Sequence, residues 1–175
     1  LCYAVIGQQL STIAAASIRN RFEQLLKKVG NTPEAILSID EATLRAIGCS
    51  TTKAKYLHNI AQFFHDRQLT DARLRKMESE EIIELLSEIK GVGRWTVEML
   101  LIFSMQRADV FAIDDLGIQK AMKELYNLED SKKSSFYTHM QKIADKWRPH
   151  RTYACLYLWK RYEQMKLNAS LARRK

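Results

Sequence analysis

Two neighbouring carboxylates, Asp114 and Asp115, end an apolar run that begins at Val110. This arrangement is typical of a chain that is about to enter a helix, where one carboxylate suffices to cap the first turn. We expect Asp114 to be that cap, which leaves Asp115 beside the positive end of the helix dipole. A carboxylate kept ionised there could stabilise a cation that develops during a reaction. Helix capping alone is the alternative interpretation of both residues.

A glycine-rich segment, residues 90–94, lies earlier in the chain and has the sequence Lys-Gly-Val-Gly-Arg. Its glycines permit a tight turn and allow another backbone to come close. Amide groups at the start of the following helix could hold a phosphate, and the side chains of Lys90 and Arg94 would add positive charge. An ordinary turn between two helices has the same local pattern, so the segment gains its meaning from its combination with Asp115.

The elements that position these residues are expected to be helices throughout. The chain has only two prolines and six glycines in 175 residues, and it lacks the alternating apolar pattern of strands. Thr32, Asp40, Ser50 and Ser79 are the expected helix caps. The predicted helices cover residues 3–28, 41–47, 52–65, 79–89, 95–105, 116–126, 134–146 and 151–165, and a basic connector with Arg67, Arg73, Arg75 and Lys76 precedes residue 79.

The charge of the chain indicates its class of partner. Lysine and arginine number 28 against 20 aspartate and glutamate residues, which gives a formal net charge of +8. Such an excess favours polyanions, either nucleic acid or an anionic membrane surface. No apolar run is long enough to span a bilayer. The chain begins at Leu1 without a methionine or a signal-peptide pattern, so we expect an intracellular protein with some N-terminal residues missing.

The cysteines and histidines do not form a pattern of metal ligands. Three cysteines, Cys2, Cys49 and Cys155, lie far apart, which is typical of buried thiols that form no disulfide. The four histidines show neither the helical spacing of a zinc site nor a cysteine at ligand spacing. These residue types therefore predict no metal centre.

Five sequence blocks, in order, resemble the helix-hairpin-helix DNA glycosylases, and the resemblance covers nearly all of the chain. Within that superfamily the chain is similar in particular to the DNA-3-methyladenine glycosylase II group. The resemblance implies an all-α, two-lobed helical bundle with the helix-hairpin-helix motif at residues 86–105. It also implies one glycosylase domain over residues 1–175 and an active-site cleft between the lobes. The blocks are Ile6-Gly7-Gln8-Gln9-Leu10-Ser11, Ile47-Gly48 with Lys53-Ala54, Gly91-Val92-Gly93-Arg94-Trp95-Thr96, Ile113-Asp114-Asp115, and Trp147-Arg148-Pro149 with Tyr153-Ala154 and Trp159.

The resemblance also implies roles for single residues. Asp115 is implied to be catalytic, and Gln9 matches the wedge that fills the gap left by a base turned out of the duplex. An exposed helix amide is the alternative role for Gln9. Backbone carbonyls near the hairpin are implied to hold a monovalent cation, Na⁺ or K⁺, and no other cofactor is expected. These carbonyls belong to Ser87, Ile89 and Val92, and the residues implied to bind DNA are Gln9, Lys90, Gly91, Val92, Gly93, Arg94 and Thr96.

The expected substrate pocket contains Trp95, Trp159 and Met99, of which Met99 stands where relatives can carry a tyrosine. Alkylation at a ring nitrogen makes a base cationic. An electron-rich aromatic face attracts such a base more than a normal one, by about 1 to 2 kcal/mol when both are desolvated. Core packing is the alternative role for the tryptophans, above all for Trp159, because Cys155 and Leu156 precede it by one helical turn.

One departure from the bifunctional relatives limits the chemistry. Relatives similar to endonuclease III carry a lysine nucleophile directly after the arginine of the hairpin, whereas this chain has Trp95 there. A lyase step through a Schiff base therefore lacks its amine. The C-terminal four-cysteine cluster of that branch and the N-terminal β domain of larger alkylation enzymes are also missing from this sequence. The departure predicts a monofunctional enzyme.

These features together predict a monomeric, monofunctional DNA glycosylase that binds double-stranded DNA with damaged bases. It would hydrolyse the N-glycosidic bond of alkylated purines such as 3-methyladenine. A cationic base is a good leaving group, so no second carboxylate is needed as general acid. Two alternatives stay open. One is a glycosylase of the same fold for mismatched adenine, oxidised guanine or a deaminated pyrimidine, and the other is a non-catalytic helix-hairpin-helix module that only binds DNA.

Overall fold

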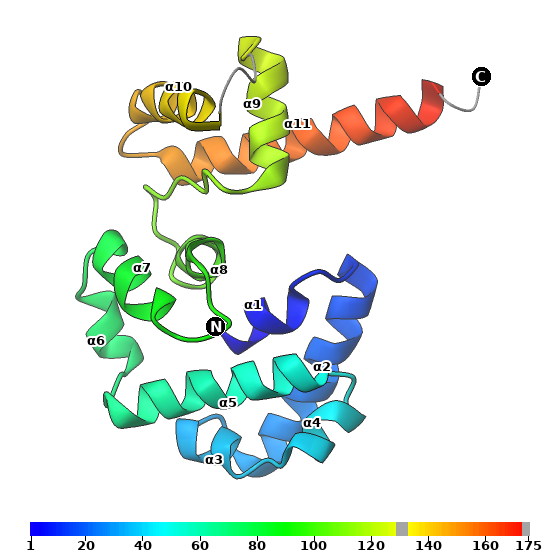
Figure 1. Ribbon diagram of the computed structural model, residues 1–175, viewed down its shortest axis with the longest axis vertical. Helices are drawn as coiled ribbons and strands as arrows, with labels where there is room; N and C mark the ends of the chain where they lie inside the picture. Colours follow the sequence, from blue (N-terminus) through cyan, green and yellow to red (C-terminus); the bar gives the residue numbers. More distant parts are fainter. Residues whose placement is uncertain (129–132, 173–175) are drawn as a thin grey trace. The chain divides into compact units, whose positions relative to one another are not determined.

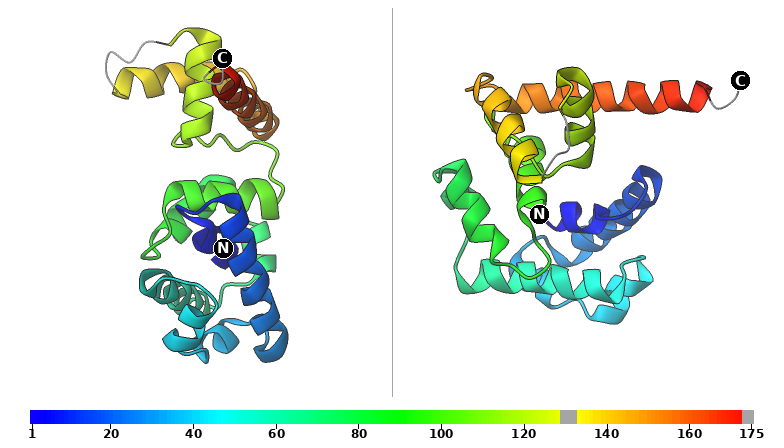
Figure 2. Two further views of the ribbon diagram at one scale, coloured as in Figure 1. Left: turned by 90° about the vertical axis from the view of Figure 1, so that its right-hand side faces the viewer. Right: turned by 45° about the horizontal axis from the view of Figure 1, so that its top comes forward.

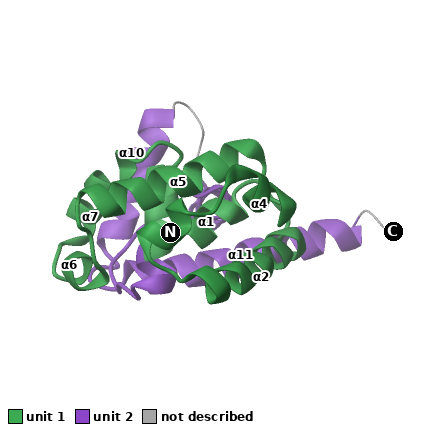
Figure 3. Ribbon diagram, turned by 90° about the horizontal axis from the view of Figure 1, so that it is seen from below, with its two compact units in different colours: residues 1–100 green, residues 101–175 purple. Residues whose placement is uncertain are grey.

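The computed structural model describes residues 1–128 and 133–172, and within these ranges its regular elements are all helices (Figure 1). This confirms the prediction of an all-α fold. None of the described helices has the length and apolar character needed to cross a bilayer. The chain divides into two compact units, residues 1–100 and residues 101–175 (Figure 3). The expectations of a single domain over residues 1–175 and of a cleft between two lobes stay predictions.

The first unit is built around helix α5. Helices α1, α3 and α4 pack on α5, and α8 packs against both α1 and α7 (Figure 1). The helix that follows the hairpin is therefore anchored on two neighbours. The helices of this unit are α1 (Cys2–Gly7), α2 (Thr12–Val29), α3 (Pro33–Leu37), α4 (Glu41–Ala46), α5 (Thr51–Asp66), α6 (Asp71–Arg75), α7 (Ser79–Ser87) and α8 (Arg94–Met99).

The second unit is organised by a pair of crossing helices. A π-helix, η1 (Leu100–Ser104), follows α8 directly and leads into this unit. Helix α9 (Leu116–Tyr126) crosses and packs against α11 (Arg151–Ala172), and α10 (Lys133–Asp145) lies between them in the sequence (Figures 1 and 2). Residues from α9 and α11 are therefore brought together although they are distant in the sequence.

Side-chain caps fix where the helices of the first unit begin. At five helix starts the capping side chain accepts a hydrogen bond from the backbone amide three residues later. The caps predicted at Thr32, Asp40 and Ser50 are confirmed, and Pro33 follows Thr32 at the first helical position. The amide and hydroxyl groups of Thr43 lower the pKa of the Asp40 carboxyl. The five caps are Ser11, Thr32, Asp40, Ser50 and Thr70.

The predicted first helix, residues 3–28, is wrong as a single element. It is interrupted between Gly7 and Thr12, where Gln9 adopts the left-handed region with φ 55°. The hydroxyl of Ser11 then caps α2 by accepting a hydrogen bond from the Ala14 amide at 3.3 Å. Apolar residues continue at helical spacing on both sides of the break, so the periodicity alone does not reveal it.

Other boundaries also differ from the predictions. The predicted basic connector contains the short helix α6, which Thr70 caps. Glu78 precedes α7 in place of Ser79, and the side chain of Glu81 accepts a hydrogen bond from the Glu78 amide at 2.8 Å. The last helix extends past residue 165 to Ala172.

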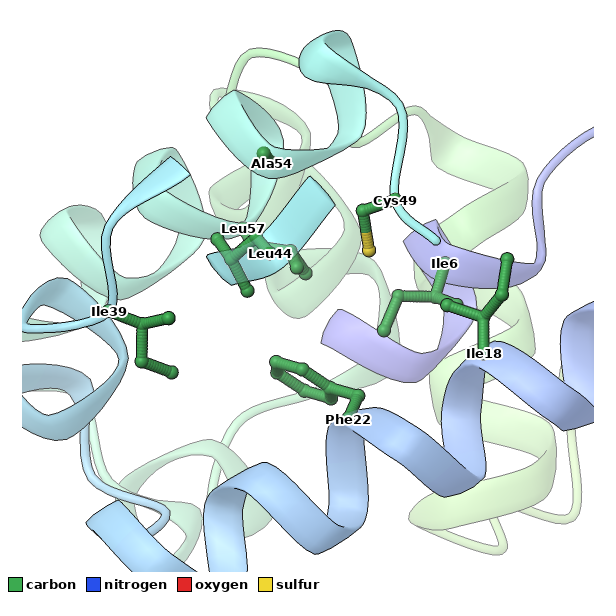
Figure 4. Close-up of a cluster of buried hydrophobic side chains, with 8 residues drawn as sticks. All are labelled: Ile6, Ile18, Phe22, Ile39, Leu44, Cys49, Ala54 and Leu57. Atoms are coloured by element: carbon green, nitrogen blue, oxygen red, sulfur yellow. The ribbon is translucent and has the colours of Figure 1, made fainter. Parts of the chain in front are cut away.

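The core of the first unit collects side chains from α1, α2, α4, α5 and the segments between them (Figure 4). Its members are at most 8% exposed, and the ring of Phe22 points into the cluster. Cys49 lies here as a buried thiol, and burial raises its pKa. Cys155 is also a buried thiol, as predicted, whereas Cys2 is only partly buried. The cluster comprises Ile6, Ile18, Phe22, Ile39, Leu44, Cys49, Ala54 and Leu57.

The start of α11 is fixed by polar contacts with the segment before α9. Arg151 donates two hydrogen bonds to the carboxylate of Asp109, at 2.6 and 3.0 Å. Desolvation acts to raise the pKa of the Asp109 carboxyl. The hydrogen bonds from Arg151 act in the opposite direction, and the pKa is lowered overall. The Thr152 hydroxyl donates to the carbonyl of Arg107 at 2.7 Å and accepts from the Val110 amide at 3.0 Å. The chain that leads to Asp115 is thus tied to α11.

Replacement of a core residue tests the packing around α5. Leu57→Ala removes a side chain with no exposed surface, so we expect the free energy of unfolding to fall by about 2 to 5 kcal/mol. Urea denaturation followed by circular dichroism measures this change. Ile13→Ala is the control, because Ile13 is 84% exposed, and its effect should stay within about 0.5 kcal/mol. Equal effects of the two substitutions would contradict the assigned core.

Candidate active site

The predicted hairpin connects α7 to α8 in the first unit. The Val92 amide donates to the Ile89 carbonyl at 2.9 Å and closes the turn. Gly91 has φ 100°, and a Cβ atom placed on it would lie 2.2 Å from Cγ of Tyr56. Both the backbone conformation and the space therefore require glycine at this position.

The second hairpin glycine, Gly93, has no such internal requirement. It is exposed, its φ of −97° suits any residue, and a Cβ atom would meet no described atom within 4 Å. A glycine that the chain itself does not require is typical of a site where another molecule approaches the backbone closely. Gly93 thus supports the interpretation of the hairpin as a binding surface.

Side chains from two other segments hold the hairpin in place. The Gln8 amide nitrogen donates to the Gly91 carbonyl at 3.3 Å and to the Thr96 hydroxyl at 3.0 Å. The Asn59 amide nitrogen donates to the Lys90 carbonyl at 3.1 Å. Thr96 is only 2% exposed, so its side chain supports the hairpin from inside the unit. The sequence did not indicate Gln8 and Asn59 for this task.

The two basic side chains of the hairpin differ in their surroundings. Arg94 donates two hydrogen bonds to Glu80, at 2.6 and 3.0 Å, and one to the buried Glu98 at 3.0 Å. The hydrogen bonds that Arg94 donates to Glu80 raise the pKa of its guanidinium, and Glu98 adds to the effect. Lys90 is exposed. The positive charge that the hairpin presents to solvent therefore comes from Lys90 more than from Arg94.

The backbone carbonyl oxygens expected to hold a monovalent cation are suitable ligand atoms for such an ion. Ser87 is the last residue of α7, and carbonyls at a helix end have no partner within the helix. The Ile89 carbonyl already accepts the Val92 amide, and a carbonyl oxygen has a second lone pair for an ion. No group of histidine, cysteine, aspartate or glutamate side chains in the described ranges could hold a metal ion.

In the second unit, Asp115 lies at the start of α9 and its carboxylate is held from two helices. Oδ1 accepts the Ile118 amide at 3.0 Å and the indole nitrogen of Trp159, on α11, at 2.9 Å. Asp115 is therefore the N-cap of α9, and the prediction that Asp114 is the cap is wrong. Asp114 is exposed and accepts a hydrogen bond from the Tyr137 hydroxyl at 2.9 Å. Capping and the predicted chemical role thus fall on the same carboxylate.

Trp159 forms an aromatic pair with Phe103. The ring centroids are 5.6 Å apart and the planes differ by 24°, which is a stacked arrangement. Trp159 is half-buried, whereas Phe103 is 59% exposed. Phe103 belongs to η1, and π-helical turns are frequent at functional sites. The sequence did not single out Phe103, because the predicted regular helix over residues 95–105 does not include this change of register.

Gly117 allows this close arrangement around Asp115. A Cβ atom on Gly117 would lie 2.9 Å from Cδ1 of Tyr162, 3.1 Å from Oδ1 of Asp115 and 3.3 Å from Cδ1 of Trp159. None of these atoms is the end of a flexible chain. A larger residue at position 117 must therefore shift the Tyr162 ring, and the carboxylate of Asp115 and the indole of Trp159 must each give way by a few tenths of an ångström. In the sequence, the only signal for a role of Gly117 is its position two residues after Asp115.

The remaining predicted residues lie in the first unit. Gln9 is exposed in the loop between α1 and α2, in its left-handed conformation. Trp95 lies in the first turn of α8 and is 36% exposed, and Met99 ends the same helix and is half-buried. The structure thus brings Gln8, the hairpin and Thr96 together in one unit, and Asp115 and Trp159 together in the other. A common pocket of Trp95, Trp159 and Met99 stays a prediction.

Comparison with known proteins gives consistent matches. The sequence matches the HhH-GPD superfamily of base excision DNA repair proteins over residues 2–149. It is 40% identical over 166 residues to DNA-3-methyladenine glycosylase 1 of Schizosaccharomyces pombe, covering 91% of this chain and 70% of the relative.

Two solved structures have a similar fold. The structure of the Schizosaccharomyces pombe 3-methyladenine DNA glycosylase in complex with abasic DNA gives a TM-score of 0.77 at 40% identity, covering 91% of this chain and 77% of that one. The structure of a DNA-3-methyladenine glycosidase from Bacillus halodurans gives 0.78 at 34% identity, covering 92% and 73%. The matches confirm the family resemblance drawn from the sequence blocks.

Substitution of Gly117 tests the packing around Asp115. In Gly117→Ala the added methyl group should crowd Tyr162, Asp115 and Trp159 and weaken the hydrogen bond from the indole to Asp115. We expect a shifted indole N–H resonance and faster hydrogen exchange at Trp159, measured by NMR and assigned with Trp159→Phe. The free energy of unfolding should fall by about 1 to 3 kcal/mol from overpacking, partly offset by the better helix propensity of alanine.

Lys120→Ala is the matched control, because Lys120 is exposed on the same helix. It should leave the Trp159 resonance in place. An unchanged Trp159 resonance in Gly117→Ala would show that the glycine is not needed for this contact.

Proposed function

The chain belongs to the HhH-GPD superfamily of base excision DNA repair proteins, and from this we propose that it is a monofunctional DNA glycosylase. Its substrates are alkylated purines such as 3-methyladenine in double-stranded DNA, and it acts as a monomer inside the cell, where the DNA is. One observation carries the proposal: the carboxylate of Asp115 is fixed by a helix amide and by the indole of Trp159. The named activity of the relatives, at up to 40% identity, supports the substrate class.

Access to the base requires that it be turned out of the duplex. Gln9 is the proposed wedge that occupies the gap. Its exposed side chain and its left-handed backbone support this role, because strained backbone at an exposed loop is frequent at functional sites. The loop is short and ends at Ser11, the N-cap of α2, so the backbone that carries the Gln9 side chain is held in a fixed position.

The hairpin is the proposed grip on the strand that carries the lesion. The backbone at Gly91, Val92 and Gly93 would contact a phosphate, and Gly93 leaves room for it. Lys90 adds charge by its side chain, whereas Arg94 and Thr96 contribute by keeping the hairpin in shape.

A monovalent cation fits the same hairpin. The carbonyls of Ser87, Ile89 and Val92 would hold it. When bound, it supplies positive charge close to the phosphate.

The flipped base is proposed to be selected by its positive charge. One face of Trp159 is stacked on Phe103, the opposite face is the one proposed to receive the base, and Trp95 and Met99 are the proposed further wall of the pocket. An aromatic face attracts a desolvated cation by about 1 to 2 kcal/mol, which favours an alkylated base over a normal one. An uncharged lesion would be better served by hydrogen-bonding side chains.

Cleavage breaks the bond between the sugar carbon and the purine nitrogen. The bonding electron pair leaves with the base, so a cationic base departs neutral and the positive charge passes to the sugar as an oxocarbenium ion. The carboxylate of Asp115 stabilises this charge, and water then adds to the carbon and loses a proton. The product is free base and an intact abasic strand. Trp95 occupies the position of the lyase nucleophile, so strand cleavage through a Schiff base has no amine.

The carboxylate charge can be removed without removing the cap. Asp115→Asn keeps an oxygen that accepts the Ile118 amide and the Trp159 indole, so folding and DNA binding should survive. Release of 3-methyladenine from methylated duplex should fall at least about 100-fold, because the negative charge facing the oxocarbenium ion is gone. Single-turnover release of labelled base measures the rate, with uracil and 8-oxoguanine duplexes as substrates that should stay intact.

Asp114→Asn is the matched control, because Asp114 is the exposed neighbour and asparagine can still accept the Tyr137 hydroxyl. It should keep most of the activity. Wild-type excision by Asp115→Asn, or a covalent enzyme–DNA adduct trapped by borohydride, would contradict the proposed mechanism.

The hairpin grip predicts a binding defect that does not depend on the lesion. Gly93→Val should fold normally, since its φ is ordinary and its Cβ has room, but the side chain would stand between the backbone and the phosphate. We expect about tenfold weaker binding, or about 1.4 kcal/mol, to damaged and undamaged duplex alike. Fluorescence anisotropy at several salt concentrations measures this, and wild-type affinity should fall steeply with salt. Affinity insensitive to salt would exclude phosphate contacts as the basis of binding.

A further inference from the structure

We propose that Lys53 and Gln8 are positioning residues that join the loop of Gln9 to the hairpin, so that wedge and phosphate grip act as one body when a base is turned out. The inference rests on the proposed function. It concerns two residues that touch neither the flipped base nor the sugar. It follows from contacts within the first unit.

Lys53 holds the end of α1. Its ammonium group, in the first turn of α5, donates to the carbonyls of Ile6 and Gln8, both at 2.8 Å. These carbonyls lie at the C-terminal end of α1, where helix carbonyls lack intrahelical partners and a lysine can satisfy them. Lys53 is half-buried, and burial lowers its pKa while the nearby Cys49 acts in the opposite direction.

The bond to the Gln8 carbonyl bears directly on Gln9. That carbonyl belongs to the peptide group between Gln8 and Gln9, so fixing it restricts the ψ angle of Gln8 and the φ angle of Gln9. Gln8 has ψ 134° and Gln9 has φ 55°, which turns the chain sharply out of α1. A left-handed residue other than glycine persists only where its surroundings define it. Lys53 binds this peptide group through its hydrogen bond to the Gln8 carbonyl.

Gln8 completes the connection to the hairpin. Its amide nitrogen has two hydrogens, and both are used, for the Gly91 carbonyl at 3.3 Å and the Thr96 hydroxyl at 3.0 Å. The residue before the proposed wedge is therefore bound to the hairpin at one of its glycines. A rotation of the loop would break these bonds.

Helix α5 is the common base of both surfaces. Lys53 binds the loop of Gln9, and Asn59 on the same helix donates to the Lys90 carbonyl of the hairpin. Tyr56 lies between them in the sequence and packs against Gly91. Three side chains of one helix thus set the spacing between wedge and grip. A connection needed only for stability would not have to join the two segments that approach DNA.

The test compares two lysines of α5. Lys53→Met keeps a long side chain without a donor, and Lys55→Met removes the same charge from an exposed position of the same helix. We expect single-turnover release of 3-methyladenine to fall about tenfold in Lys53→Met and to stay within twofold of wild type in Lys55→Met. The fluorescence of 2-aminopurine placed opposite the lesion should show fewer flipped bases for Lys53→Met only. Affinity for undamaged duplex should be equal in the two variants.

A double-mutant cycle with Gln9→Ala separates the inference from the proposed function. If Lys53 acts through Gln9, Lys53→Met should cause no further loss in the Gln9→Ala background. Full additivity would overturn the inference and leave the wedge in place. No effect of Gln9→Ala itself would instead refute the wedge role.

A second variant covers the case in which Lys53→Met does not fold, which thermal unfolding would reveal. Gln8→Leu removes the amide that binds the hairpin and keeps the size of the side chain. It should reproduce the tenfold loss of excision and the loss of flipped bases. Wild-type excision by Gln8→Leu would overturn the inference.

Discussion

The candidate active site depends on one oxygen atom that two helices hold. Oδ1 of Asp115 accepts the Ile118 amide within α9 and the Trp159 indole from α11. The two donors can meet only if α9 and α11 are packed closely, and the packing leaves room for no side chain at Gly117. A carboxylate that must face a developing cation gains from donors that are fixed before the reaction, because they need no reorganisation. The tie between Arg151 and Asp109 extends the same constraint to the chain that precedes Asp115.

The proposed role of the first unit poses a different problem, which is to hold an anion without burying a cation. Arg94, the obvious candidate, is committed to Glu80 and Glu98 and strengthens the frame of the hairpin. In the proposed complex, phosphate binding is left to backbone amides and to the exposed Lys90. Amides that are held in place bind phosphate without the loss of side-chain entropy that a long basic residue would suffer. The side chain of Gln8, behind the hairpin, holds this backbone in place through its bonds to Gly91 and Thr96.

Local signals in the sequence were sufficient for much of this architecture. Three helix caps and the turn between α7 and α8 are recognised from neighbouring residues, and the structure confirms them. The errors concern choices that distant residues make. A rule based on neighbouring residues cannot tell which of two adjacent aspartates caps the helix. The one that does, Asp115, also accepts a hydrogen bond from Trp159, 44 positions away. The break after α1 goes with bonds from Gln8 to residues 83 and 88 positions away. Phe103 lies in a π-helical turn, which a regular helical periodicity does not predict.

The pairing of an aromatic face with a carboxylate has a consequence for catalysis. In the proposed reaction the positive charge begins on the alkylated base and ends on the sugar. The face of Trp159 attracts the charge where it starts, so this attraction weakens as the bond breaks and serves selection more than rate. Asp115 attracts the charge where it arrives, and its effect grows toward the transition state. The indole nitrogen of Trp159 also donates to Asp115, so one side chain fixes the distance between the aromatic face and the carboxylate. The stack on Phe103 keeps the indole ring from rotating. Recognition of a cationic base and stabilisation of a cationic sugar are therefore set by one rigid group.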